Sequence, residues 1–134
     1  MAAQIFVNLP VKDINRSVEF FTKLDFTFDP KFTYENATCI IVGEHIFVML
    51  LVESFFKTFT AKDICDATNE VLVCISADSR ERINEMVSKA VAAGGTTPNR
   101  SKDYGFMYQH GFQDLDGHFW ELIKKRAISR RSKV

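Results

Sequence analysis

The chain has 134 residues, of which 46% are hydrophobic and 25% charged, and these are ordinary values for one soluble domain. Lys plus Arg and Asp plus Glu both total 17, so the net charge does not favour binding to nucleic acid. The longest apolar run, residues 46–52, is far shorter than the roughly 20 residues of a membrane helix, and residues 1–8 lack a secretory signal pattern. We therefore expect a cytoplasmic protein with no nucleic-acid or membrane partner.

The first half of the chain predicts the element order β-α-β-β-β. Residues 5–9 form a short apolar run with β-branched and aromatic members, which is typical of a strand. Asp13 then stands where a helix N-cap would, and apolar residues follow it at helical spacing. Further strands are expected at residues 26–28, 37–42 and 46–52, with a hairpin turn at Gly43-Glu44 between the last two.

The second half predicts the same order after a connector. The connector, residues 54–69, is rich in Phe and predicts a short helix after Thr60. A strand is expected at residues 71–75, followed by a helix that Asp78 caps and Gly94-Gly95 ends. Three more strands are expected at residues 96–99, 106–113 and 118–123.

The two halves superimpose at a fixed offset of 65 residues, which places Asp13 on Asp78. We therefore predict an α+β fold of two tandem β-α-β-β-β modules in one domain, residues 1–126. The modules span about 4–53 and 70–124, and residues 127–134 form a basic tail that we interpret as a solvated end. Because a sheet cannot leave both faces bare, helices should cover one face of each sheet while the other faces curl into a cup.

The closing segment, Asp114-Leu115-Asp116-Gly117-His118-Phe119-Trp120-Glu121, makes the chain resemble the vicinal oxygen chelate superfamily. This superfamily includes glyoxalases, bleomycin resistance proteins, fosfomycin-modifying enzymes and extradiol dioxygenases. The resemblance covers residues 4–124, and Leu115 replaces the proline usual in the motif. It implies the glyoxalase/bleomycin resistance fold, a cupped mixed β-sheet with flanking helices.

In the metal enzymes of that superfamily the final-strand glutamate is a ligand, and Glu121 matches it. Their histidine positions, seven residues before each helix-cap aspartate, hold Phe6 and Val71 here, and their fourth-strand carboxylate falls near Leu50. These three side chains have no lone pair to give a metal. The resemblance thus implies no cofactor, with a divalent metal on non-standard ligands as the alternative.

Replacement metal ligands could come only from five side chains: Asn8, His45, Gln109, His110 and His118. His118 and Glu121 are three residues apart, so on a strand they point to opposite faces. Gln109 and His110 are adjacent, so at most one of them enters the cup. A metal site built from this set is the weaker reading.

Glu121 is the candidate catalytic residue, either as a general base or as a hydrogen-bonding group for a ligand. Its alternative role is a glutamate paired with a cation or exposed at the mouth. Phe119 shares its strand face, and Phe6 and Asn8 face inward on the first strand, although Asn8 could instead bond a neighbouring turn. Tyr104 and Tyr108 could place hydroxyl groups at the rim, and a core role is equally open for each.

Two classes of function remain at this point. The first is a glyoxalase/bleomycin resistance-like protein that binds a small-molecule ligand in an apolar cup without the usual metal centre. The second is a metal-dependent lyase, epimerase or dioxygenase with non-standard ligands, so the sequence leaves open whether the chain is an enzyme. Members of this superfamily commonly pair, and the Phe-rich connector offers apolar surface to bury, so we also expect a homodimer.

Overall fold

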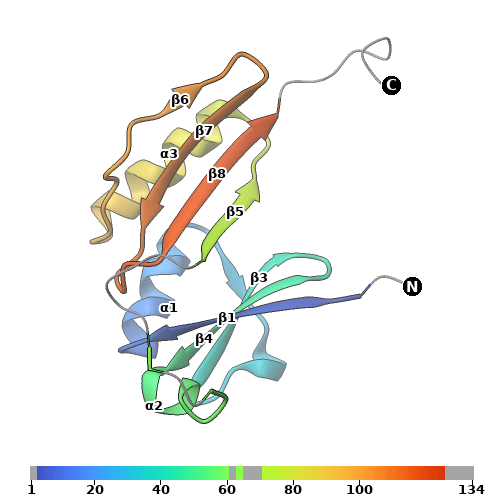
Figure 1. Cartoon of the computed structure of the whole chain (residues 1–134), viewed down its shortest axis with the longest axis vertical. Coiled ribbons are helices and arrows are strands. Elements are labelled where there is room, and N and C mark those ends of the chain that lie inside the picture. The colour runs from blue at the N-terminus through green and yellow to red at the C-terminus, as the bar shows by residue number, and fades with distance from the viewer. Residues whose placement is uncertain (1–2, 61–62, 65–70, 126–134) are drawn as a thin grey trace.

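The computed structural model describes residues 3–60, 63–64 and 71–125 (Figure 1). The first module contains β1 (Ile5–Val11), α1 (Ile14–Lys23), β2 (Thr27–Phe28), the 3-10 helix η1 (Pro30–Phe32), β3 (Ala37–Gly43) and β4 (Ile46–Val52). The short helix α2 (Glu53–Phe56) follows. The second module contains β5 (Leu72–Ser76), α3 (Arg80–Ala92), β6 (Lys102–Asp103), β7 (Met107–Gln113) and β8 (Phe119–Lys125).

Each module forms its own four-stranded mixed sheet. The strand orders are β1-β4-β3-β2 and β5-β8-β7-β6, so the two sheets have the same topology. The first strand of each module runs parallel to its last strand, β1 beside β4 and β5 beside β8, and the other pairs are antiparallel. The predicted pair of tandem modules and the α+β fold class are therefore confirmed.

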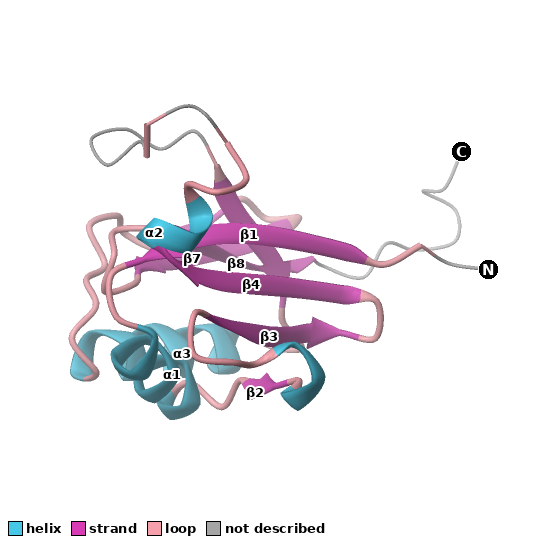
Figure 2. Cartoon of the chain, turned by 90° about the horizontal axis from the view of Figure 1, so that it is seen from below, coloured by secondary structure: helices cyan, strands magenta, loops and turns pink. Residues whose placement is uncertain are grey.

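One hydrophobic core serves both modules and contains both long helices. The side chains on one face of each sheet, such as Leu9 and Leu50 in the first and Trp120 and Leu122 in the second, join this core. Helix α1 reaches across to the second sheet, since the Phe21 ring lies 5.1 Å from the Trp120 ring. In the view of Figure 2, α1 and α3 lie side by side, below β1 and β4. Both helices thus sit against the inner faces of the two sheets.

This arrangement changes where the predicted cup could form. The opposite faces of the two sheets, one carrying Phe6 and Asn8 and the other Glu121, point away from the shared core. The apolar cluster on the outer face of the first sheet contains, within the described residues, no member from the second module. Within the described residues, the inner faces of both sheets join the core that holds the flanking helices, so the Phe6 face and the Glu121 face of one chain share no apolar cluster.

The second helix begins one residue later than predicted. Ser79, rather than Asp78, is the N-cap of α3, and its hydroxyl accepts a hydrogen bond from the Arg82 amide at 3.0 Å. Asp13 caps α1 as predicted. The structural offset between the modules is therefore 66 residues, and the counterpart of Phe6 is Leu72 rather than Val71.

One strand of the second module differs from the prediction. The sixth strand is β6 rather than residues 96–99, of which Thr96 makes only an isolated bridge to Gln113. Pro98 has no amide hydrogen for a strand ladder, which explains why this segment does not form a strand. A short helix, α2, lies before Thr60. The helix expected after Thr60 falls on residues 61–62 and 65–70, which lie outside the described residues, as does the tail, 127–134.

The closing motif ties the two modules together. Asp114 is buried and accepts hydrogen bonds from the Asp116 and His118 amides and from the Trp120 indole. Asp116 in turn accepts a hydrogen bond from the Lys12 amide of the first module at 3.0 Å. His118 Nε2 lies 2.6 Å from the Pro10 carbonyl oxygen and donates to it. The segment that carries the family resemblance therefore holds the first module on the second.

Candidate functional site

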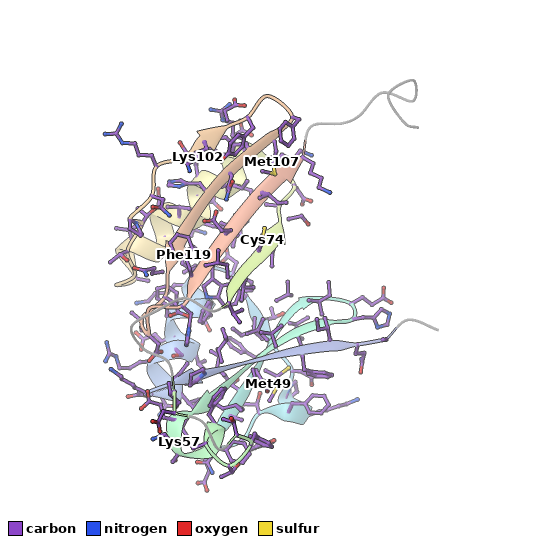
Figure 3. All side chains as sticks on the ribbon, viewed as in Figure 1. Met49, Lys57, Cys74, Lys102, Met107 and Phe119 are labelled. Atoms are coloured by element: carbon purple, nitrogen blue, oxygen red, sulfur yellow. The ribbon has the colours of Figure 1, made fainter. Side chains whose placement is uncertain are left out.

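Glu121 lies at the middle of the outer face of the second sheet. Its strand, β8, places Phe119 and Ile123 on the same face, as the alternation of the sequence predicted. Trp120 and Leu122 are buried beneath the helices, also as predicted. Cys74 on β5 and Gly111 on β7 lie opposite Glu121 in the two neighbouring strands. In Figure 3 the labels of Cys74 and Phe119 mark this sheet, and that of Met49 marks the other.

The Glu121 carboxylate is held by one neighbour. Gln109 Nε2 donates a hydrogen bond to Glu121 Oε2 at 2.7 Å, whereas Oε1 accepts none within the described part of the chain. Gly111 leaves room for this arrangement, because an added Cβ would lie 3.2 Å from the Glu121 carboxyl carbon and 2.9 Å from the Phe119 ring. Sequence reasoning named Gln109 only as a possible metal ligand and missed its role as the donor to Glu121. Gln109 and Gly111 are two residues apart on one strand and therefore share a face. This spacing is the sequence signal that could have indicated their place beside Glu121.

A small hollow of about 30 Å³ adjoins the carboxylate. Gln109, His110 and Gly111 line it with Glu121, and the side chains of Arg100 and Lys102 stand at its exposed rim. A hollow of this size has room for about one water molecule. No ion pair to Glu121 forms among the residues that the structure describes, so the predicted alternative of a cation-paired glutamate is not what the geometry shows.

Burial favours the uncharged form of two neighbouring groups. The pKa of His110 lies below its ordinary value because burial disfavours the charged ring, although the negative Glu121 acts in the opposite direction. Burial, and then the charge of Glu121, raise the pKa of the Cys74 thiol. His110 Nδ1 is buried and has no hydrogen-bond partner in the described chain. The Cys74 thiol and the Gln109 amide therefore share the outer face with the carboxylate, whereas His110 projects from the opposite face of β7.

The outer face of the first sheet is filled by its own side chains. The Phe6 ring stacks on Phe47 with ring centroids 4.8 Å apart, and Phe32 from η1 meets it edge-on at 5.6 Å. Met49 is buried beneath this cluster. Asn8 is exposed and its amide nitrogen lies 3.5 Å from the Phe6 carbonyl oxygen, a local contact of the kind foreseen as its alternative. The chain does not bring Phe6 or Asn8 to Glu121.

The tyrosines also lie away from Glu121. Tyr108 faces the shared core, and its hydroxyl donates a hydrogen bond to Asn84 of α3 at 2.5 Å, as its alternative core role implied. Tyr104 is half-exposed at the β6–β7 turn beside Phe106. His45 lies in the β3–β4 turn.

The residues at the superfamily's ligand positions do not fit a metal ion. Leu72 and Phe6 occupy the two histidine positions. The fourth-strand position is Met49 rather than Leu50, because Met49 lies opposite Asn8 just as Glu121 lies opposite Cys74, and Leu50 faces the core. Glu121 is thus the only oxygen or nitrogen donor in this set. No group of three His, Cys, Asp or Glu side chains suited to a metal occurs among the described residues.

Comparison with known proteins agrees with the fold. Residues 4–43 match the family model described as bleomycin resistance protein-like N-terminal. A hypothetical protein, SA1046, from S. aureus is 25% identical with a TM-score of 0.79, over 92% of this chain and 95% of that one. No curated protein sequence matches the chain, and none of its described helices is long and apolar enough to cross a membrane.

Two more solved structures carry family names. A glyoxalase/bleomycin resistance protein/dioxygenase family enzyme from Burkholderia phytofirmans PsJN is 16% identical with a TM-score of 0.80, over 93% of this chain and 100% of that one. Lactoylglutathione lyase from Agrobacterium tumefaciens is 12% identical with a TM-score of 0.67, over 92% and 94%. These likenesses show the fold. Together with the family-model match over residues 4–43, they support the resemblance to the vicinal oxygen chelate superfamily that the closing motif indicates.

Proposed function

We propose that this protein binds a small organic molecule at the outer face of its second sheet and does so without the superfamily's usual metal centre. The observation that carries the proposal is the donor set: Glu121 remains, while Phe6, Met49 and Leu72 occupy the other ligand positions. One carboxylate oxygen of Glu121 is engaged by Gln109, and the other is free to accept a hydrogen bond from a ligand. Phe119, Ile123 and Leu72 offer apolar contacts beside it.

The alternative function is a lyase, epimerase or dioxygenase that holds a metal through other ligands. The neutral state favoured for His110 would suit metal ligation. However, His110 shares its strand face with Tyr108 and Phe112 toward the core, whereas Glu121 lies on the outer face. The binding function therefore has the stronger support.

A titration with metal-free bleomycin tests the binding function. Bleomycin is a suitable probe because it carries amines, amides and flat heteroaromatic rings, which match a free carboxylate oxygen flanked by apolar side chains. We expect saturable binding that Glu121→Gln weakens about tenfold, which corresponds to about 1.4 kcal/mol, as measured by isothermal titration calorimetry. Glu44→Gln, in an exposed turn, is the matched control and should bind like the parent. Equal affinity of the parent and Glu121→Gln, or no binding by the parent, would contradict the proposal.

We further propose that the protein is a homodimer in which a second copy covers exposed apolar edges. The supporting feature is an apolar groove of about 220 Å³ between the edge strands β1 and β5. Ile5, Ile46, Val71 and Leu72 line it and are each about half-exposed. In one chain the Phe6 face and the Glu121 face both point outward. A second copy would allow the Phe6 face of one chain to meet the Glu121 face of the other and form a cup.

A further inference from the structure

A second, larger pocket opens at the far end of the second sheet, where the β6–β7 turn and the end of β8 meet the first turn of α3. It has a volume of about 320 Å³, and Arg80, Asp103, Met107, Tyr108, Lys124 and Lys125 line it. None of these residues borders the hollow at Glu121. Figure 3 labels Met107 beside this turn. The volume falls in the range of small-molecule sites, which begins at about 300 Å³.

The charges that line this basic pocket favour an anion. Arg80, Lys124 and Lys125 contribute three positive charges against the one carboxylate of Asp103. Asp103 is already paired with Arg80, at 3.0 Å between Oδ2 and Nη1. Lys124 and Lys125 take part in no ion pair within residues 3–60, 63–64 and 71–125. Two lysine charges at one pocket are therefore uncompensated by the described residues, and such ammonium groups form strong hydrogen bonds with phosphate or carboxylate.

The wall of the pocket is preformed and partly apolar. The Arg80 guanidinium lies over the Tyr108 ring, 4.3 Å from its centroid, and the Tyr108 hydroxyl is fixed by its hydrogen bond to Asn84. A cation held over an aromatic ring in this way loses little freedom when a ligand arrives. Met107 supplies apolar surface beside Lys125, its cross-strand partner.

We propose that the basic pocket binds a small organic phosphate, with the phosphate group at Lys125 and an apolar or aromatic body against Met107, its cross-strand partner, while Lys124 adds positive charge to the same pocket. This ligand site is separate from the site proposed at Glu121 and does not depend on its function. A purely inorganic anion would use the charges and leave the apolar wall bare, so the organic part should add to the affinity.

The experiment is a titration of the full, isotope-labelled chain with phenyl phosphate, followed by nuclear magnetic resonance. We expect saturable shifts of the Gly105 and Met107 amides. The double variant Lys124→Gln/Lys125→Gln should bind about tenfold more weakly, a loss of about 1.4 kcal/mol. Lys31→Gln/Lys57→Gln removes the same charge from exposed positions elsewhere and should leave the affinity unchanged.

Three results would overturn the proposal. The first is the absence of saturable shifts at Gly105 and Met107 in the parent. The second is an equal loss of affinity in both double variants, because net charge alone would then explain binding. The third is inorganic phosphate binding as tightly as phenyl phosphate, because the apolar wall would then contribute nothing.

Discussion

At the scale of single residues, the environment of Glu121 is set by the hydrogen-bond donor Gln109 and by Gly111, which has no side chain. Gln109 fixes a carboxylate oxygen, and Gly111 keeps the space over which the carboxylate lies. Strand alternation in the sequence was enough to predict that Phe119 shares the face of Glu121 and that Gln109 and His110 diverge. The hydrogen bond itself could not be predicted, because it joins diagonal positions on two strands whose register the sequence does not state.

The neutral state of His110 gives a prediction for the pH dependence of stability. Its pKa in the folded protein is lowered, so as the pH falls through about 6.5 the unfolded chain takes up a proton that the folded chain resists. The free energy of unfolding should therefore decrease as the pH is lowered from about 7.5 to about 5.5, a range that extends about one unit either side of the ordinary histidine pKa. In His110→Gln this fall should be smaller, as measured by urea unfolding at each pH. An unchanged slope in His110→Gln would contradict the assignment.

At the scale of elements, hydrophobic periodicity identified both long helices and all the long strands. Errors occurred where short elements compete: Pro98 prevents the strand predicted at 96–99, and two adjacent polar residues, Asp78 and Ser79, both suit a helix cap. The sequence could not decide between these caps, because both residue types accept hydrogen bonds from helix amides. The one-residue difference matters, since it moves the counterpart of Phe6 from Val71 to Leu72.

The position of the α3 cap is testable by a pair of substitutions. Ser79→Ala removes the acceptor of the Arg82 amide and should lower the free energy of unfolding by about 1 kcal/mol. Asp78→Ala removes no cap bond and should have a much smaller effect, as measured by urea unfolding of both variants. A larger loss from Asp78→Ala than from Ser79→Ala would restore the cap at Asp78.

At the scale of the whole molecule, the tandem repeat and the closing motif predicted the fold, whereas the packing of one module on the other was not predictable from them. Each sheet has two apolar faces, and the sequence pattern does not say which face meets the other module. The structure places α1 and α3 in the shared core and leaves the Phe6 and Glu121 faces outside. His118, which the sequence analysis considered as a metal ligand, instead helps to hold the modules together, as does Asp116.

The exposed apolar edges at this scale give a prediction of oligomeric state. Sedimentation equilibrium at micromolar concentration should give a mass near twice that of one 15.3 kDa chain. Leu72→Glu places a charge at the exposed edge of β5 and should shift the mass toward that of one chain, whereas Lys57→Glu should not. A parent mass near 15.3 kDa would contradict the dimer.

Elemental analysis of the protein purified without chelators tests most directly whether Glu121 works in a metal-free site. Because Phe6, Met49 and Leu72 have replaced the donors that would join Glu121, we predict nickel, zinc, iron and manganese contents far below one ion per chain. A content near one ion per chain that is lost in Glu121→Gln would contradict the metal-free binding function and favour the metal-dependent enzyme.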